Sequence, residues 1–128
     1  MRIILDTNVL IRALIEPNKL SPSARAILED AEHEVFFSVA SVWEIAIKSA
    51  LGKADFQVSP DEIVESALAS GFVELPVRTP AALKVATLPH LHRDPFDRLL
   101  VAQAMTEPAQ LYTTDNDLIA YSELVVHV

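Results

Sequence analysis

Cysteine is absent from the 128 residues, which excludes a disulfide framework and a thiolate zinc site. The chain also lacks an excess of basic residues, because 10 lysines and arginines stand against 18 aspartates and glutamates, for a formal net charge of -8. Proteins that bind nucleic acid through its phosphates usually present a basic face. The acidic balance therefore argues against a simple phosphate-binding surface and is compatible with a cation-binding site or a basic protein partner.

Long apolar runs are lacking as well. The apolar stretch near the N-terminus, within residues 1–5, is broken by Asp6 and is too short for a signal peptide or a membrane span. We therefore expect a cytoplasmic protein that does not act at a membrane. No internal repeat, low-complexity tract or long linker divides the sequence, so residues 1–128 are expected to form a single domain.

What the sequence does contain is a regular alternation of strand and helix patterns. Strands are predicted at residues 2–5, 35–39, 72–75, 110–113 and 124–126, and helices at 9–15, 21–31, 41–51, 59–70, 79–88, 94–107 and 115–121. This alternation predicts an α/β fold, a three-layer sandwich whose central, mostly parallel sheet is flanked by helices. Binding sites in such folds lie outside the carboxyl ends of the strands.

Four acidic residues fall at predicted strand ends or helix starts, which this fold tends to bring to one edge of the sheet: Asp6, Glu44, Asp97 and Asp115. Carboxylates crowded in one cleft repel one another and raise their own pKa values unless something neutralises them. A divalent cation does so, and carboxylate and water ligands suit Mg²⁺ or Mn²⁺. Such a metal activates water and stabilises charge on phosphate, so the pattern points to phosphodiester cleavage.

Each acid also has a purely structural interpretation. Asp6 is a good N-cap for the helix that follows it, and Glu44 completes a capping-box pattern with Ser41. At the start of the helix predicted over residues 94–107, the capping role and the metal-binding role fall to different acids. Asp94 precedes a proline and is the natural cap, which leaves Asp97 free to point elsewhere.

The stretches that carry these acids resemble the four motifs of the PIN-domain family, and within it the VapC-type toxins of bacterial toxin–antitoxin pairs. They are residues 3–10, 38–45, 92–104 and 111–115. The motifs come in the family's order and span nearly the whole chain. The resemblance implies a PIN-like fold, a metal-dependent endoribonuclease, an RNA substrate, a homodimer, and an antitoxin whose tail blocks the cleft.

The resemblance also implies roles for individual residues. The metal-binding acids would be Asp6, Glu44, Asp97 and Asp115, with Thr113 near the fourth. Asn8 would orient Asp6. The fourth motif leaves one choice open, because Asp117 lies two residues beyond Asp115 and either carboxylate is a candidate ligand.

Basic residues near the acids have two interpretations. Arg93 and Arg98 bracket the third motif and are either solvated salt-bridge partners or phosphate contacts beside the metal. Lys48 and Lys53 would extend such a basic track, which would reconcile RNA binding with an acidic chain.

The histidines and aromatic residues are expected to have ordinary roles. The two histidines His90 and His92 could bind a metal, but the favoured interpretation is that they belong to a polar loop. The aromatic side chains expected in the core are Phe36, Phe37, Trp43 and Phe96, with Trp43 also a candidate for a dimer surface.

Two other functions fit part of the pattern. A phosphoaspartyl phosphatase for small molecules also has an aspartate after its first strand, but it usually needs a second acid two positions on, where this chain has Asn8. A catalytically silent PIN-like binding module would keep the fold without the chemistry. Three results would distinguish these functions. RNA cleavage would indicate the ribonuclease, hydrolysis of a small phosphate ester the phosphatase, and metal binding without cleavage the binding module.

Overall fold

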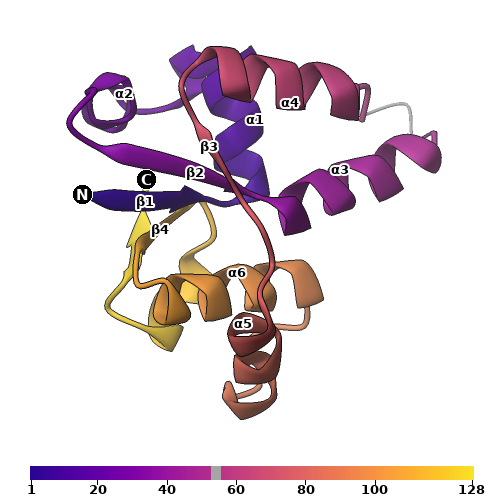
Figure 1. The fold of residues 1–128 in the computed structure, drawn as a ribbon, viewed down its shortest axis with the longest axis vertical. Coiled ribbons are helices and arrows are strands. Elements are labelled where there is room, and N and C mark those ends of the chain that lie inside the picture. The colour runs from indigo at the N-terminus through magenta and orange to yellow at the C-terminus, as the bar shows by residue number, and fades with distance from the viewer. Residues whose placement is uncertain (53–55) are drawn as a thin grey trace.

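The computed structural model describes residues 1–52 and 56–128, and Figure 1 shows its fold. The strands are β1 (Arg2–Leu5), β2 (Glu34–Ser38), β3 (Val73–Leu75), β4 (Gln110–Thr113) and β5 (Val125–His127). The helices are α1 (Thr7–Ile15), α2 (Pro22–Glu29), α3 (Val39–Ala50), α4 (Pro60–Ala69), α5 (Thr79–Lys84) and α6 (Pro95–Thr106), with short 3₁₀ helices η1 (Pro17–Lys19), η2 (Val85–Thr87) and η3 (Asn116–Tyr121). Each predicted strand and helix is present.

The five strands form one sheet in the order β3-β2-β1-β4-β5. Each neighbouring pair is parallel, so Ile3 in β1 lies opposite Val35 in β2 on one side and Gln110 in β4 on the other. The chain first builds outward from β1 through β2 to β3 and then returns to place β4 on the other side. The strand order therefore reverses at β1, which puts a crevice at the carboxyl ends of β1 and β4.

Two hydrophobic clusters lie on opposite faces of this sheet. Successive side chains of a strand point to opposite faces, so Ile3 packs in one cluster with Val9 of α1 and Ile63 of α4, while Ile4 packs in the other with Leu100 of α6. Figure 1 shows α1, α2 and α4 over one face and α5 and α6 over the other. This arrangement confirms the predicted α/β sandwich. In the described part of the chain, no helix is long and apolar enough to span a membrane.

The start of α3 differs from its prediction. The helix begins at Val39, directly after β2, and its N-cap is Ser38, whose hydroxyl accepts the Ala40 N–H at 3.0 Å. The expected capping box of Ser41 and Glu44 is wrong, because both residues lie inside the helix and are buried. The strand runs into the helix without a linker, which moves the cap upstream.

Two side chains expected to be buried are not. Phe36 and Phe37 are in the core as predicted, but Trp43 is 60% exposed on α3 and Phe96 is half-buried. Their rings meet edge to face, with centroids 5.2 Å apart. The second helix, predicted over residues 21–31, is shorter, because α2 ends at Glu29 and Ala31 is exposed beyond it.

Candidate active site

Asp6 stands at the point where the strand order reverses, and three groups fix it there. One carboxylate oxygen, Oδ1, accepts the Val9 N–H at 2.7 Å and caps α1. The other, Oδ2, accepts the Thr113 hydroxyl of β4 at 2.5 Å. The Asp6 backbone N–H donates to the Tyr112 carbonyl at 2.9 Å. Asp6 is thus both the predicted cap and a carboxylate held between the two central strands.

Glu44 reaches the same region from α3. Its side chain is buried, with Oε1 lying 2.6 Å from the Thr7 hydroxyl and Oε2 lying 2.6 Å from Lys48 Nζ. The Thr7 hydroxyl also lies 2.9 Å from that of Ser41. Hydrogen bonding to Glu44 raises the pKa of Lys48. The sequence analysis did not identify Thr7 as a site residue. Its position directly after Asp6, at the start of a helix, was the one feature that could have indicated this role.

Asp94 and Asp97 take different roles at the start of α6, as the proline between them predicts. Asp94 Oδ1 accepts the N–H groups of Phe96 at 2.9 Å and Asp97 at 3.4 Å, so Asp94 is the N-cap. The Asp97 carboxylate does not cap the helix. Burial, followed by the nearby charges of Asp94, Asp6 and Glu44, raises the pKa of Asp97 to about 7.

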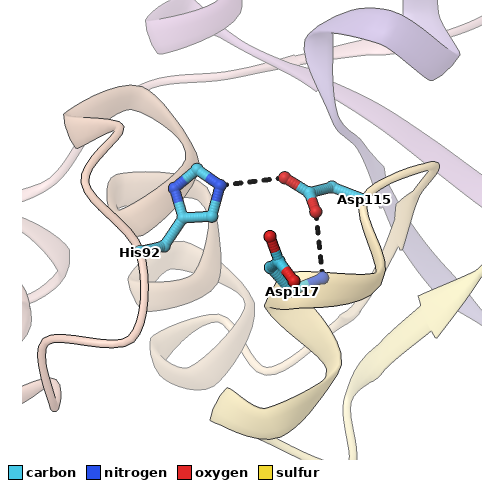
Figure 2. Close-up of side chains that lie close together, drawn as sticks. All are labelled: His92, Asp115 and Asp117. Carbon is cyan, nitrogen blue, oxygen red and sulfur yellow. Dashed lines mark hydrogen bonds and ion pairs between the residues drawn. The ribbon is translucent and has the colours of Figure 1, made fainter.

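Asp115 follows β4 and caps η3 through the Asp117 N–H at 2.9 Å. Its second carboxylate oxygen, Oδ2, lies 2.9 Å from His92 Nε2 (Figure 2). Among the described residues, the set of possible ligands whose atoms all lie within 4.8 Å of one another is His92, Asp115 and Asp117. Asp97 is next to this set, since its Oδ2 lies 3.8 Å from His92 Nε2.

A cavity of about 190 Å³ joins these elements at the carboxyl edge of the sheet. Its acidic lining residues are Asp6, Glu44, Asp94, Asp97 and Asp115, and Lys48 and Asn8 also face it. All four acids singled out from the sequence therefore share one cavity. Their carboxylates are spaced more widely than the ligand atoms of His92, Asp115 and Asp117, which all lie within 4.8 Å of one another. A larger cavity of about 520 Å³, lined by parts of α1, α2 and the turn before β3, has none of these acids.

A family model for the PIN domain matches residues 3–124. The chain belongs to the PIN-domain family. The matched region begins in the first strand of the sheet and ends just before the last, so it includes every element that brings an acid to the cavity.

Solved structures show the same PIN fold at low sequence identity. A VapBC2 complex from Rickettsia felis bound to promoter DNA has 16% identity and a TM-score of 0.75, covering 99% of this chain and 98% of that one. A DNA-bound VapBC from Salmonella typhimurium has 14% identity and a TM-score of 0.70, covering 99% and 98%. FitAcB from Neisseria gonorrhoeae has 23% identity and a TM-score of 0.59, covering 98% and 96%. Comparison with curated proteins finds no match.

The donor set in this PIN domain fits a divalent cation. Carboxylate oxygens are the ligands that suit Mg²⁺ and Mn²⁺. Burial also raises the pKa of Asp6, and neighbouring charges add to the pKa shifts of both Asp6 and Asp97. These shifts indicate more negative charge than the cavity stabilises by itself, and a bound cation would offset it.

The choice between the two acids of the fourth motif follows from where they point. Asp115 lines the acidic cavity, whereas Asp117 is exposed and lines a separate groove with the loop of residues 90–93. We therefore take Asp115 as the residue of this pair that faces the other acids. Both histidines lie in the loop before α6, as the polar-loop interpretation expects, but they differ in exposure, because His90 is exposed and His92 is half-buried against Asp115.

Arg98 has a structural role. Only 8% exposed, it donates from Nη1 to the Pro89 carbonyl at 2.9 Å and the Tyr121 hydroxyl at 3.1 Å, and from Nη2 to the Val85 carbonyl at 3.2 Å. Both expected roles, phosphate contact and solvated salt bridge, are wrong for Arg98, because its guanidinium is buried and donates its hydrogen bonds to these acceptors inside the protein. Arg93 is exposed on the groove beside it.

Asn8 does not orient Asp6 as expected. Its amide donates to the Thr114 hydroxyl at 3.4 Å at the exposed edge of the cavity, while Val9 and Thr113 hold the Asp6 carboxylate. Thr113 lies next to Asp115 as expected, accepting its backbone N–H at 3.0 Å, and its hydroxyl also donates to Asp6. Lys53 lies outside the described residues.

Proposed function

We propose that this PIN domain is a Mg²⁺- or Mn²⁺-dependent endoribonuclease and the toxin of a toxin–antitoxin pair. The observation that carries the proposal is the shared cavity at the carboxyl edge of the sheet. Four separate segments of the chain each contribute one acid to it: Asp6, Glu44, Asp97 and Asp115. Such a cluster of carboxylates costs stability unless a cation neutralises it, so its assembly is understandable as a metal site.

In this proposal the four acids hold the metal ion, which when bound activates a water and stabilises charge on the phosphate. The chain's own residues supply the positioning. The Thr113 hydroxyl and the Val9 N–H fix the two oxygens of Asp6. Thr7 and Lys48 hold the two oxygens of Glu44 in the same way. Rigid carboxylates lose little freedom when they bind a cation, which favours binding.

Lys48 and Arg93 are the proposed contacts to RNA phosphates. The side chain of Lys48 is 47% exposed at the cavity, and Arg93 is exposed on the groove beside it. A few cations at the rim of an acidic cleft would attract a phosphate backbone without requiring a basic protein overall. This arrangement would account for RNA binding by a chain with a net charge of -8.

The proposed partners are an antitoxin and a second copy of the chain, in the cytoplasm. The neighbours in fold are solved as VapBC and FitAcB complexes, which supports an antitoxin. An antitoxin tail would be expected to place an arginine or lysine among the acids, since charge-assisted pairs with carboxylates are strong. An apolar face of α3 that includes Trp43 and Ile47 is exposed and supports a homodimer.

RNA cleavage tests the enzymatic part of the proposal. The purified protein should cut at least one RNA of a broad panel in Mg²⁺ or Mn²⁺, and EDTA should stop the reaction. Asp6→Asn and Asp97→Asn should each abolish cleavage, whereas Glu65→Gln, which removes an exposed acid of α4, should retain it. A small phosphate ester should not be hydrolysed. Equal cleavage by wild type and Asp97→Asn would exclude this site as the source of activity.

Growth tests the biological part. Expression of the wild-type chain alone should arrest the cells that make it, and Asp6→Asn should relieve the arrest at equal protein level. Equal arrest by the two proteins would separate toxicity from the acidic cavity and overturn the proposed role.

A further inference from the structure

Both ring nitrogens of His92 have a partner, and the partners differ in kind. Nδ1 lies 3.0 Å from the backbone N–H of Asp94, which can only donate. Nε2 lies 2.9 Å from Oδ2 of Asp115, which can only accept when ionised. Nδ1 must therefore be the unprotonated nitrogen, and the neutral ring carries its hydrogen on Nε2. The Nε2–H group donates to Asp115.

This arrangement speaks against His92 as a metal ligand, although it lies close to two acids (Figure 2). A histidine that binds a metal through one nitrogen normally donates the N–H of the other nitrogen to a carboxylate, a carbonyl or water. Here the other nitrogen faces an N–H donor. Binding a cation through Nε2 would require a hydrogen on Nδ1, directed at the Asp94 amide.

We propose that His92 is a positioning residue that fixes Asp115 for the metal site, and the proposal rests on the function proposed above. Oδ1 of Asp115 is held by the Asp117 N–H and Oδ2 by His92, so the carboxylate cannot rotate freely. Each ionised carboxylate oxygen can accept more than one hydrogen bond, so lone pairs remain for a cation.

The same loop thus places two of the acids. The side chain of Asp94 caps α6 and sets the turn that carries Asp97, while its backbone N–H sets the proton position of His92 and, through it, the orientation of Asp115. Segments that are 23 residues apart in sequence become coupled at the cavity edge.

Imidazole nitrogen chemical shifts test the proton position directly. At a pH where the ring is neutral, His92 should show the Nε2–H tautomer, and it should keep this tautomer when Mg²⁺ is added. A ring with its hydrogen on Nδ1, or loss of the Nε2–H signal on Mg²⁺ binding, would identify His92 as a ligand and overturn the proposal.

Two amide variants test the positioning. His92→Gln can place an N–H near the position of Nε2, whereas His92→Asn keeps an acceptor for the Asp94 N–H but ends short of Asp115. In calorimetric titrations with Mn²⁺, wild type and His92→Gln should bind with similar affinity, and His92→Asn should bind roughly 10- to 100-fold more weakly. Circular dichroism would confirm that both variants fold.

The outcomes separate the two proposals. If all three proteins bind Mn²⁺ equally well, the role of His92 is overturned while the metal site stands. If His92→Gln is as weak as His92→Asn, the Nε2–H bond is not what His92 contributes. If the wild type does not bind Mn²⁺, the proposed function fails and the positioning role fails with it, even if the tautomer is as expected.

Discussion

Asp97 shows how far a single residue departs from its ordinary chemistry in this fold. Along the sequence it lies 53 residues from Glu44 and 91 from Asp6, yet all three side chains line one cavity. Burial and the charges of its neighbours there raise the pKa of Asp97 to about 7.

The raised pKa of Asp97 predicts how the metal-free protein responds to pH. An acid whose pKa is higher in the folded than in the unfolded chain binds more protons when folded, so the free energy of unfolding falls as pH rises between the two values. For Asp97 that window runs from 3.8 to about 7. The loss is expected to be on the order of a few kcal/mol. Urea denaturation in EDTA at a series of pH values measures it.

Asp97→Asn is the matched variant for this test, because it keeps the shape of the side chain and removes the ionisable group. Its unfolding free energy should fall less between pH 3.8 and about 7 than that of the wild type. Identical pH dependence in the two proteins would show that Asp97 does not titrate in this window.

Asp94 and Asp97 should also respond differently to metal. Asparagine caps a helix about as well as aspartate, so Asp94→Asn should cost little stability and keep the stabilisation by Mn²⁺. That stabilisation is about 2.7 kcal/mol at about a hundredfold excess over the dissociation constant. Asp97→Asn should gain much less from Mn²⁺. Thermal denaturation with and without Mn²⁺ measures both, and the reverse pattern would exchange the roles of the two acids.

The division of roles between Asp94 and Asp97 could be predicted from the sequence because it depends on a local signal, the proline that starts α6. The role of His92 could not, since its acceptor Asp115 lies 23 residues away. Arg98 was misassigned for a similar reason. Its partners in η2 and η3 are set by packing, and a charged residue in a sequence is ordinarily expected at the surface.

At the scale of elements, Ser38 joins three parts of the structure. Its hydroxyl caps α3 and also donates to Gln103 Oε1 of α6 at 2.5 Å, while Gln103 Nε2 donates to the Pro76 carbonyl after β3 at 3.3 Å. Helix ends marked by proline were predictable from local sequence. The junction at Ser38 could not be predicted in this way, because no proline marks it and a single residue both ends β2 and caps α3.

Ser38→Ala should therefore cost more than the loss of an ordinary cap. Removing the cap costs roughly 0.5–2 kcal/mol, and leaving the buried Gln103 acceptor without its donor costs a further ~1–3 kcal/mol. Ser59→Ala is the control, because Ser59 caps α4 through an exposed hydrogen bond from the Glu62 N–H and, within the described part of the chain, its hydroxyl has no buried side-chain partner. Urea denaturation compares them, and an equal loss in both variants would exclude the contribution of Gln103.

At the scale of the whole molecule, α3 presents an apolar face to solvent. Residues four apart lie on one side of a helix, and the exposed set at this spacing is Val39, Trp43, Ile47 and Leu51. The proposed homodimer is expected to bury this face, since apolar side chains gathered on a surface favour association.

Ile47→Glu should therefore shift the protein toward the monomer, because it would place a charge within the buried face of the proposed dimer. Light scattering coupled to size-exclusion chromatography measures the mass. Leu68→Glu, which introduces the same charge on the exposed face of α4, should leave the dimer intact. A monomeric wild type, or a dimer unaffected by Ile47→Glu, would rule out this face as the interface.

The placement of β1 between β2 and β4 also has a consequence for biosynthesis. The Thr113 hydroxyl that holds Asp6 comes 107 residues after it, so this pairing must wait until β4 has left the ribosome. Pairing between strands so distant in sequence requires a large loop to close and is therefore slow. A nascent chain that still lacks β4 has the first three acids but not the strand that closes their cavity. A protein proposed to cut RNA would in this way remain inert toward the messenger being translated until β4 has been made and paired with β1.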